Sequence, residues 1–293
     1  MSKSVRIGIG GWKFEPWDES FYPATLPAKR QLEYASRKLT AIEVNATYYG
    51  SFKPEVFAKW GDESPEGFVF SLKAHRFTTV RKTREDMVKS VDMFIGSGIT
   101  ALKHRLGPIN WQFPPTRKFD AEYFETFLSV LPKEKDKLPL RHVLEVRATG
   151  FDTPQFYDLL TRYGATVVYA DDDEFPQLRH EGADFAVTRM MRSQPDIATG
   201  YSAKDLDAFA RLYKGWSAKQ DVFAFFISGA KENNPAAAMA LQEKLGIRPQ
   251  QSSEADAMAV AGKKPVVARA AKTTVAKKPA ARKTPAPKAA SKK

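Results

Sequence analysis

The chain has 293 residues and contains no cysteine, which excludes disulfide bonds and thiolate chemistry. This absence favours a reducing compartment, and we expect the protein to be cytoplasmic. No apolar stretch approaches the roughly 18 residues of a membrane-spanning helix. The first dozen residues also lack the charged start, apolar run and small-residue cleavage site of a signal peptide. The sequence therefore predicts a soluble intracellular protein with no membrane partner.

Several chemical signatures are missing as well. The four histidines, His75, His104, His142 and His180, form neither a His-x-His nor a His-Glu-x-x-His pattern, so no dedicated zinc site is expected. There is no glycine-rich phosphate loop with Lys-Ser/Thr, no Gly-x-Ser-x-Gly elbow and no Gly-x-Gly-x-x-Gly after a strand. The sequence thus identifies no cofactor and no metal.

The positive charge is concentrated at one end of the chain. The formal net charge is +12, but residues 249–293 hold eleven Lys or Arg against two acidic residues, so the rest is nearly balanced. Ala, Lys and Pro recur in this segment without apolar periodicity, and such a composition cannot bury enough surface to offset its ordering entropy. We expect a barrel domain over residues 1–248 and a disordered Lys/Ala/Pro-rich tail over residues 249–293.

The predicted tail resembles the basic tails of histone H1-like proteins. Its cations would neutralise phosphates without reading sequence, which makes nucleic acid a candidate partner. The alternative is a solvated appendage with no specific partner, since runs of charge are commonly solvated. The candidate nucleic-acid contacts are Lys263, Lys264, Lys277, Lys278 and Lys283.

Strand-like and helix-like segments alternate before this tail. The predicted strands are 5–10, 41–45, 68–73, 109–113, 142–147, 166–171, 185–189 and 222–228. The predicted helices are 28–39, 54–61, 84–102, 121–131, 154–163, 203–216 and 235–245, with a loop over 172–181. This rhythm and size favour an α/β fold of the TIM (β/α)8 barrel type over a doubly wound open sheet, which usually has fewer strands.

Charged and amide side chains occur near the ends of strands that are otherwise apolar. Because successive residues of a strand face opposite sides, polar residues with the parity opposite to the apolar ones should point into the barrel. In this fold, catalytic groups come from the C-terminal ends of the strands. The residues are Glu43, Asn45, Lys73, Gln112, Glu145, Arg147, Asp171 and Arg189. The alternative is a buried ion network with a purely structural role.

These residue types suit a small anionic or polyhydroxylated molecule. Arg147 and Arg189 could clamp a carboxylate or phosphate, with Asn45 and Gln112 as further contacts. The candidate catalytic residues are Glu43, Glu145, Lys73 and Asp171.

Each candidate has a chemical role. Glu43 or Glu145 would be an acid or base whose pKa is raised by burial. Lys73 would be either a Schiff-base nucleophile or, as the simpler interpretation, an ion-pair partner. A hydrolase, a lyase, an isomerase and a barrel that binds without chemistry all remain open, as does the oligomeric state.

The loop after the first strand is rich in aromatic residues. Trp12 could lay its ring over a ligand, and Tyr48, after the second strand, raises the same possibility. Alternatively, Trp12, Trp17 and Phe21 only form the local core that a long loop needs.

Several sequence motifs, in their residues and their order, resemble those of the YecE-like family, catalogued as domain of unknown function seventy-two. The motifs are Gly-Trp-Lys-Phe at 11–14 leading to Phe-Tyr-Pro at 21–23, Glu-Val-Asn-Ala-Thr-Tyr-Tyr at 43–49, Gln-Phe-Pro-Pro at 112–115 and Glu-Val-Arg at 145–147. The resemblance covers about residues 5–246. It implies a TIM barrel and supplies no reaction.

The chain departs from this family pattern at three strand ends. Ala148 stands where the family usually has a histidine, and Met190-Met191 follow Arg189 in place of His-Gly. Ile227-Ser228 replace a pair of asparagines at the end of the last strand. Two possible acid/base histidines are therefore absent, while the carboxylates and arginines remain. The resemblance favours ligand binding over a shared reaction.

The tail hypothesis makes a simple prediction. The full-length chain should retard DNA or RNA in a gel shift, and the retardation should weaken steeply with salt because counterions are released on binding. A chain without residues 250–293 should not. Equal binding by both would exclude the tail as the contact.

Overall fold

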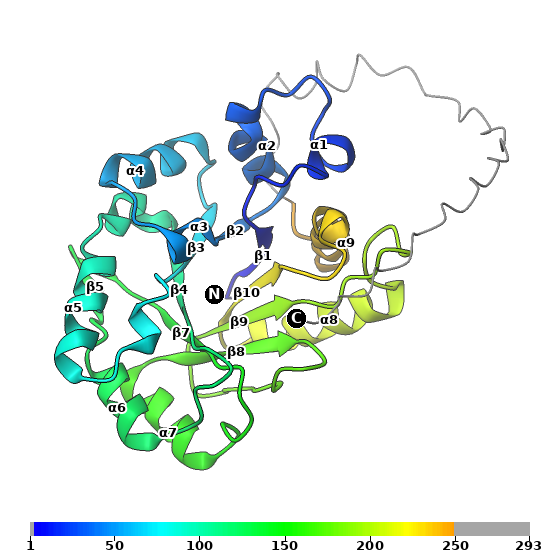
Figure 1. The fold of residues 1–293 in the computed structure, drawn as a ribbon. Helices are drawn as coiled ribbons and strands as arrows, with labels where there is room; N and C mark the ends of the chain where they lie inside the picture. Colours follow the sequence, from blue (N-terminus) through cyan, green and yellow to red (C-terminus); the bar gives the residue numbers. More distant parts are fainter. Residues whose placement is uncertain (1–2, 249–293) are drawn as a thin grey trace, which may run out of the picture.

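The predicted TIM barrel is confirmed in a computed structural model, which describes residues 3–248 (Figure 1). Eight parallel strands close in the order β1-β10-β9-β8-β7-β4-β3-β2, and helices surround them. The barrel strands are β1 (Val5–Gly10), β2 (Ala41–Val44), β3 (Val69–Lys73), β4 (Leu106–Gln112), β7 (His142–Glu145), β8 (Thr166–Asp171), β9 (Phe185–Met190) and β10 (Asp221–Phe226).

Helices follow the barrel strands as the predicted alternation requires. The α-helices are α1 (Trp17–Ser20), α2 (Gln31–Lys38), α3 (Ala46–Tyr49), α4 (Pro54–Glu63), α5 (Arg84–Ile95), α6 (Ala121–Ser129), α7 (Pro154–Tyr163), α8 (Ala203–Ser217) and α9 (Asn234–Leu245). Short 3₁₀ turns are η1 (Ala28–Arg30), η2 (Thr78–Val80), η3 (Ile99–Arg105) and η4 (Lys231–Asn233), and a small hairpin joins β5 (Glu134–Lys135) to β6 (Leu138–Pro139). The loop predicted over 172–181 contains no helix.

Local sequence fixes several helix starts. Thr83, Asp120, Thr153 and Ser202 each precede a helix, and each side chain accepts a hydrogen bond from the backbone N–H three residues later. Such caps satisfy a donor that the first helical turn leaves unpaired. The four caps thus fix where α5, α6, α7 and α8 begin.

Several predicted bounds differ from the structure by a few residues, and two elements differ most. The single helix expected over 84–102 ends at Ile95, and Gly98 then takes a left-handed conformation (φ 99°) before η3 begins. The fourth strand begins at Leu106 rather than Ile109 and includes Pro108. Because proline has no N–H to give to a ladder, the β3–β4 register shifts between Phe70 and Leu72.

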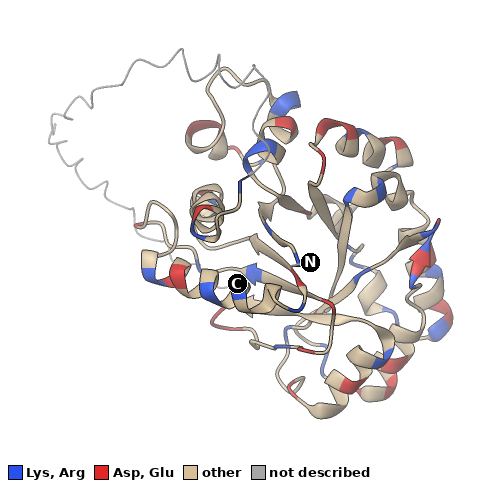
Figure 2. Cartoon of the chain, turned by 180° about the vertical axis from the view of Figure 1, so that it is seen from behind, with Lys and Arg blue, Asp and Glu red and all other residues tan. Residues whose placement is uncertain are grey.

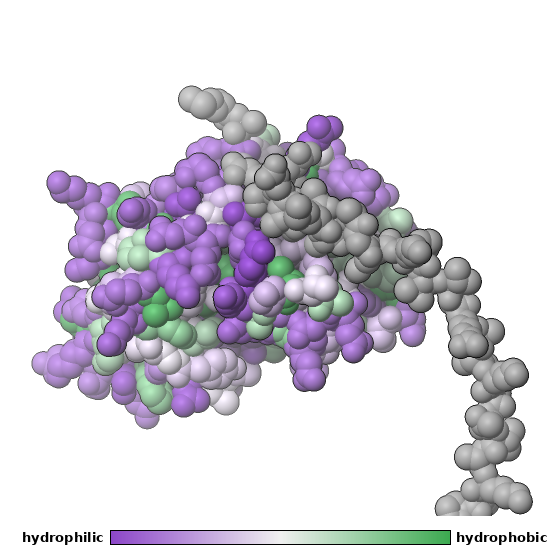
Figure 3. Space-filling view, turned by 90° about the horizontal axis from the view of Figure 1, so that it is seen from above, coloured by the Kyte–Doolittle hydropathy of each residue, from purple (hydrophilic) through white to green (hydrophobic). Residues whose placement is uncertain are grey.

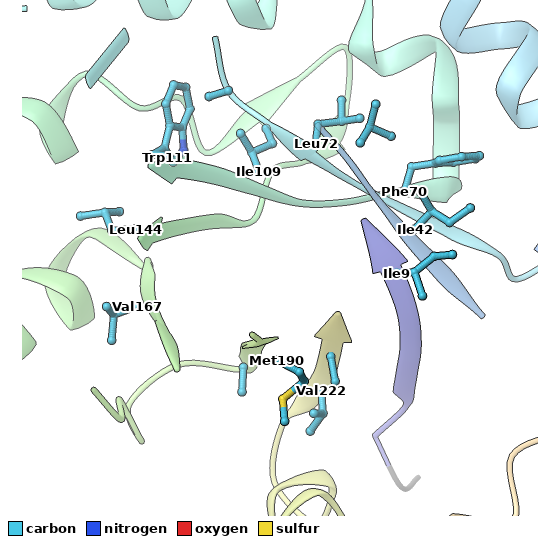
Figure 4. Packing of buried hydrophobic residues seen from close by; sticks show 14 of the residues in the cluster. Ile9, Ile42, Phe70, Leu72, Ile109, Trp111, Leu144, Val167, Met190 and Val222 are labelled. Carbon is cyan, nitrogen blue, oxygen red and sulfur yellow. The ribbon is translucent and has the colours of Figure 1, made fainter. Parts of the chain in front are cut away.

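Alternation along the strands separates two apolar clusters. Outward-facing residues such as Ile9, Ile42, Phe70 and Trp111 pack against the helices (Figure 4). Inward-facing residues form a second cluster that fills the barrel: Ala41, Val143, Val168, Phe185, Val187, Phe223 and Phe225. The interior is therefore largely a packed apolar core.

The outer surface carries the charge that the interior largely excludes. Lys, Arg, Asp and Glu mark the surrounding helices (Figure 2), and hydrophilic residues cover most of the face seen from above, with smaller hydrophobic patches between them (Figure 3). Within residues 3–248, no helix is long and apolar enough to cross a membrane. The predicted tail at 249–293 and its candidate nucleic-acid contacts lie outside the described residues.

The close approach of β1 and β2 predicts that replacing Gly8 destabilises the protein. A Cβ on Gly8 would lie 1.9 Å from the backbone oxygen of Ala41, so the strands would have to move apart. We expect Gly8→Ala to lower the free energy of unfolding by roughly 1–3 kcal/mol. Gly215→Ala, in α8 with open space around it, should instead raise it by about 0.5–1 kcal/mol. Urea denaturation of both variants measures this, and equal effects would contradict it.

Candidate functional site

Four ionisable residues from four strands lie inside the barrel above its apolar core. Glu43, Lys73, Glu145 and Arg189 are all buried. Their strand neighbours Ile42, Leu72, Leu144 and Met190 belong to the outer cluster, so the four side chains face inward. The structure thus brings these predicted residues together at the C-terminal ends of the strands.

Arg189 is the centre of this group. Its Nε and Nη2 donate to the two carboxylate oxygens of Glu43 at 3.2 and 3.0 Å, and its Nη1 donates to Glu145 Oε1 at 2.6 Å. All three side chains are nearly inaccessible to solvent, at 2% exposed or less. Arg189 lines the cavity described below, but its hydrogen bonds already go to two carboxylates, which leaves little of it for a substrate anion.

Arg147 extends the network towards solvent. Its Nε and Nη2 donate to Glu145 Oε1 at 2.9 and 2.6 Å, and Nη2 also donates to Gln112 Oε1 at 3.0 Å. The guanidinium lies 4.6 Å from the ring centroid of Phe175. Glu145 is completed from below by Asn110, whose Nδ2 donates to its Oε2 at 2.9 Å. The head of Arg147 is thereby fixed at the boundary between interior and opening.

The charges around Glu145 overturn one prediction. Burial alone would raise the pKa of its carboxyl, but Arg189, Arg147 and Lys73, together with the Asn110 hydrogen bond, outweigh burial and lower the pKa to about 2. The same arrangement raises the pKa of Arg189 despite its burial. Glu145 is thus held as a carboxylate, and the expected raised pKa is wrong for this residue.

Asp171 does not join the group. The β8–β9 register pairs Ala170 with Arg189 and Asp171 with Met190, so Asp171 faces the helices like its partner. Arg192 Nε donates to its carboxylate at 2.9 Å and the Tyr201 hydroxyl donates to it at 3.1 Å. The prediction that Asp171 points into the barrel is therefore wrong, because its side chain lies on the opposite face of β8.

A cavity of about 750 Å³ opens above the four inward residues. All six predicted substrate-binding residues line it, together with Lys73, which was predicted to be catalytic: Trp12, Asn45, Tyr48, Gln112, Arg147 and Arg189. Glu43 and Glu145 are not among the lining residues and lie beneath them. The catalytic roles predicted for these two carboxylates stay predictions.

The aromatic loop after β1 divides its residues between two tasks. Trp12 lines the cavity and packs edge-on against Trp60, with ring centroids 5.2 Å apart. Trp17 and Phe21 are buried in the core of the loop itself. The Trp17 Nε1–H donates to the backbone oxygen of Lys231 at 3.0 Å, which ties this loop to the turn after β10. Trp17 and Phe21 thus fit the interpretation as a local core, and the ligand contact predicted for Trp12 stays a prediction.

Lys73 has an unusual environment for a buried cation. Within residues 3–248 it forms no ion pair within 4.0 Å, so the predicted ion-pair role is not seen. Its Nζ lies 4.7 Å from the ring centroid of Tyr48. Burial lowers the pKa of this amine to about 8, and Arg189 adds to the effect, while Glu145 and Glu43 oppose it.

Sequence reasoning missed several residues of the cavity wall, namely Lys13, Asp172, Phe175, Met191 and Lys231. Lys231 lies in η4, with its Nζ 4.4 Å from the ring centroid of Phe14. A position directly after β8 was the available signal for Asp172. No three His, Asp or Glu residues in the described part of the chain are grouped so that they could hold a metal ion.

The fold and the site together define a TIM-barrel protein with a charged cavity at the C-terminal ends of its strands. The model of the family described as "Protein of unknown function DUF72" matches residues 6–261, and the chain belongs to this family. The resemblance deduced from the sequence motifs is thus confirmed.

Relatives of this family share the fold. The UPF0759 protein YunF of Bacillus subtilis is 26% identical over 160 residues, which are 53% of this chain and 54% of YunF; the chain thus spans about half of that relative. A DUF72 family protein from Thermotoga maritima superposes with a TM-score of 0.65 at 24% identity, over 82% of this chain and 98% of the other. One from Enterococcus faecalis gives 0.63 at 15% identity, over 84% and 98%.

The lowered pKa of Glu145 predicts how its replacement will act at different pH values. A depressed folded-state pKa stabilises the protein above the ordinary value of 4.5, and this contribution is lost as the pH falls towards 2. Glu145→Gln should lower the free energy of unfolding by about 3 kcal/mol at pH 7, because Arg189 loses a buried partner. The deficit should shrink between pH 4.5 and 2.

Chemical denaturation at several pH values gives the measurement. Glu66→Gln is the matched control, since Glu66 is 69% exposed and pairs only at the surface. It should change stability by no more than about 1 kcal/mol. A deficit for Glu145→Gln that does not vary with pH would contradict the assignment of charge.

Proposed function

We propose that the cavity at the barrel mouth binds a small anionic molecule bearing hydroxyl groups and presents it to Lys73. The observation that carries this proposal is the charge of the cavity wall. Five cationic residues line it, Lys13, Lys73, Arg147, Arg189 and Lys231, against one carboxylate, Asp172. Even with Glu43 and Glu145 beneath, the cations are in excess, and such a cavity attracts anions.

Arg147 is the best-placed contact for the anion. Its Nε and Nη2 donate hydrogen bonds to Glu145 and Gln112, and the Phe175 ring packs against the guanidinium. Its side chain is still 21% exposed, whereas that of Arg189 is 2% exposed. A guanidinium fixed in this way binds a carboxylate or phosphate with little loss of side-chain freedom.

The rest of the wall suits a hydroxylated body. Trp12, Tyr48 and Phe175 supply ring faces, while the Asn45 and Gln112 amides supply donors and acceptors. A volume of about 750 Å³ falls within the range of small-molecule sites. These features support a metabolite-sized ligand.

Glu43 and Glu145 then act as positioning residues. Their carboxylates hold Arg189, and Glu145 also holds Arg147, so that the cations stay in place when the cavity is empty. Lys73 is left as the ionisable side chain of the cavity floor with no ion-pair partner among the described residues. Turnover, where it occurs, is expected to depend on Lys73.

Binding of simple anions tests this proposal. The full-length protein should be stabilised against heating by glucose 6-phosphate or citrate and not by glucose, and the effect should weaken with salt. Arg147→Gln and Lys231→Gln should each weaken binding about tenfold or more, because each removes a charge-assisted contact.

Lys59→Gln is the matched control for these variants. Lys59 is 70% exposed on α4 and does not line the cavity, so binding should not change. Titration calorimetry at low salt gives the affinities. Equal stabilisation by glucose and glucose 6-phosphate, or equal loss in all three variants, would refute the proposal.

A further inference from the structure

Lys73 presents a primary amine to the cavity in a setting that ordinary surface lysines lack. The residue ends β3, and its side chain points inward beside that of Asn110, its partner on β4. It is 8% exposed, and that exposure is to the cavity that it lines. Its Nζ lies over the Tyr48 ring, 4.7 Å from the ring centroid.

We infer that Lys73 Nζ forms an imine with the carbonyl carbon of an anionic aldehyde or ketone bound in the cavity. The inference rests on the proposed function, since it requires the cavity to hold the anionic end of the ligand. It adds the class of ligand, a carbonyl compound with a carboxylate or phosphate group, and the atom that reacts.

The charged groups around Lys73 favour the free amine. The charges that act on the pKa of its amine are those of Arg189, Glu145, Glu43 and Arg147, and the arginines counter the carboxylates. With burial added, the pKa is about 8, so about one molecule in ten carries a neutral, nucleophilic amine at pH 7. For an ordinary lysine this fraction is about one in 2,500.

The covalent step needs no further reagent. The Nζ lone pair forms the C–N bond while the carbonyl π electrons move onto oxygen, which takes the first amine proton. The C–O bond then breaks, and oxygen leaves as water with the second amine proton, giving a neutral imine. Arg147 is placed to hold the carboxylate or phosphate. The site should therefore select ligands whose carbonyl carbon reaches Lys73 while their anionic group is bound to Arg147.

Lys231 and Lys13 also line the cavity, but their positions differ. Lys231 Nζ lies over the Phe14 and Trp17 rings at 4.4 and 5.3 Å from their centroids, at the side of the opening. Lys13 is exposed. Of the three, only Lys73 lies on the floor among the buried charges, next to the network that fixes Arg147.

Reductive trapping tests the inference directly. The full-length protein is incubated with dilute glyoxylate and cyanoborohydride, and its peptides are mapped by mass spectrometry. A carboxymethyl group should appear on Lys73 at least about tenfold faster than on exposed Lys59, following the larger fraction of free amine. The rate at Lys73 should increase from pH 6 to 8, and added citrate should slow it.

Variants and a second probe separate the possible outcomes. Lys73→Arg should lose the label at this position while thermal unfolding shows it folded. Acetaldehyde, which has no anionic group, should show a smaller preference for Lys73 than glyoxylate does, because only the larger fraction of free amine then favours this residue. Labelling of Lys73 no faster than Lys59, or preferential labelling of Lys231, overturns the inference. If citrate binds while Lys73 is not labelled, the imine is wrong and the proposed binding function stands. If no anion binds, both are wrong.

Discussion

The pairing of Arg189 with Glu43 and Glu145 is the constraint on which the rest of the site depends. It connects β9 to β2 and β7, strands that are not neighbours in the sheet, through the interior of the barrel. Removing three charges from water costs several kcal/mol per ion, and good geometry only offsets that cost. A hydrophobic filling would serve stability as well, so the network is better explained by what it holds in place. It orients Arg147 and sets the charge that Lys73 experiences.

Most of the architecture was predictable because it follows from alternation. Apolar residues at every second strand position, with polar ones between them, were enough to place Glu43, Lys73, Glu145 and Arg189 inside a closed sheet. The same rule failed for Asp171, because parity at a strand end depends on register with the neighbouring strand. The sequence of one strand gives the order of its residues but not its register with the next strand.

The electrostatics were less predictable than the positions. Burial was expected to raise the pKa of Glu145, and burial does act in that direction, but two guanidinium groups within hydrogen-bonding distance reverse the result. The expected ion pair of Lys73 is not seen, because the carboxylates of Glu43 and Glu145 already bind arginines. Lys231 was missed because it lies in η4, where neither periodicity nor a motif marks it.

The hydrogen bond from the Trp17 indole to the backbone oxygen of Lys231 has a consequence for folding during synthesis. It joins a loop from the beginning of the described chain to a turn near its end, and β1 and β10 meet at the same seam. During synthesis, the wall of the cavity therefore stays open until almost all of the barrel has left the ribosome. A nascent chain thus already contains Lys73, but the cavity wall around its amine is not yet complete. The enclosure of Lys73 is therefore a property of the completed barrel.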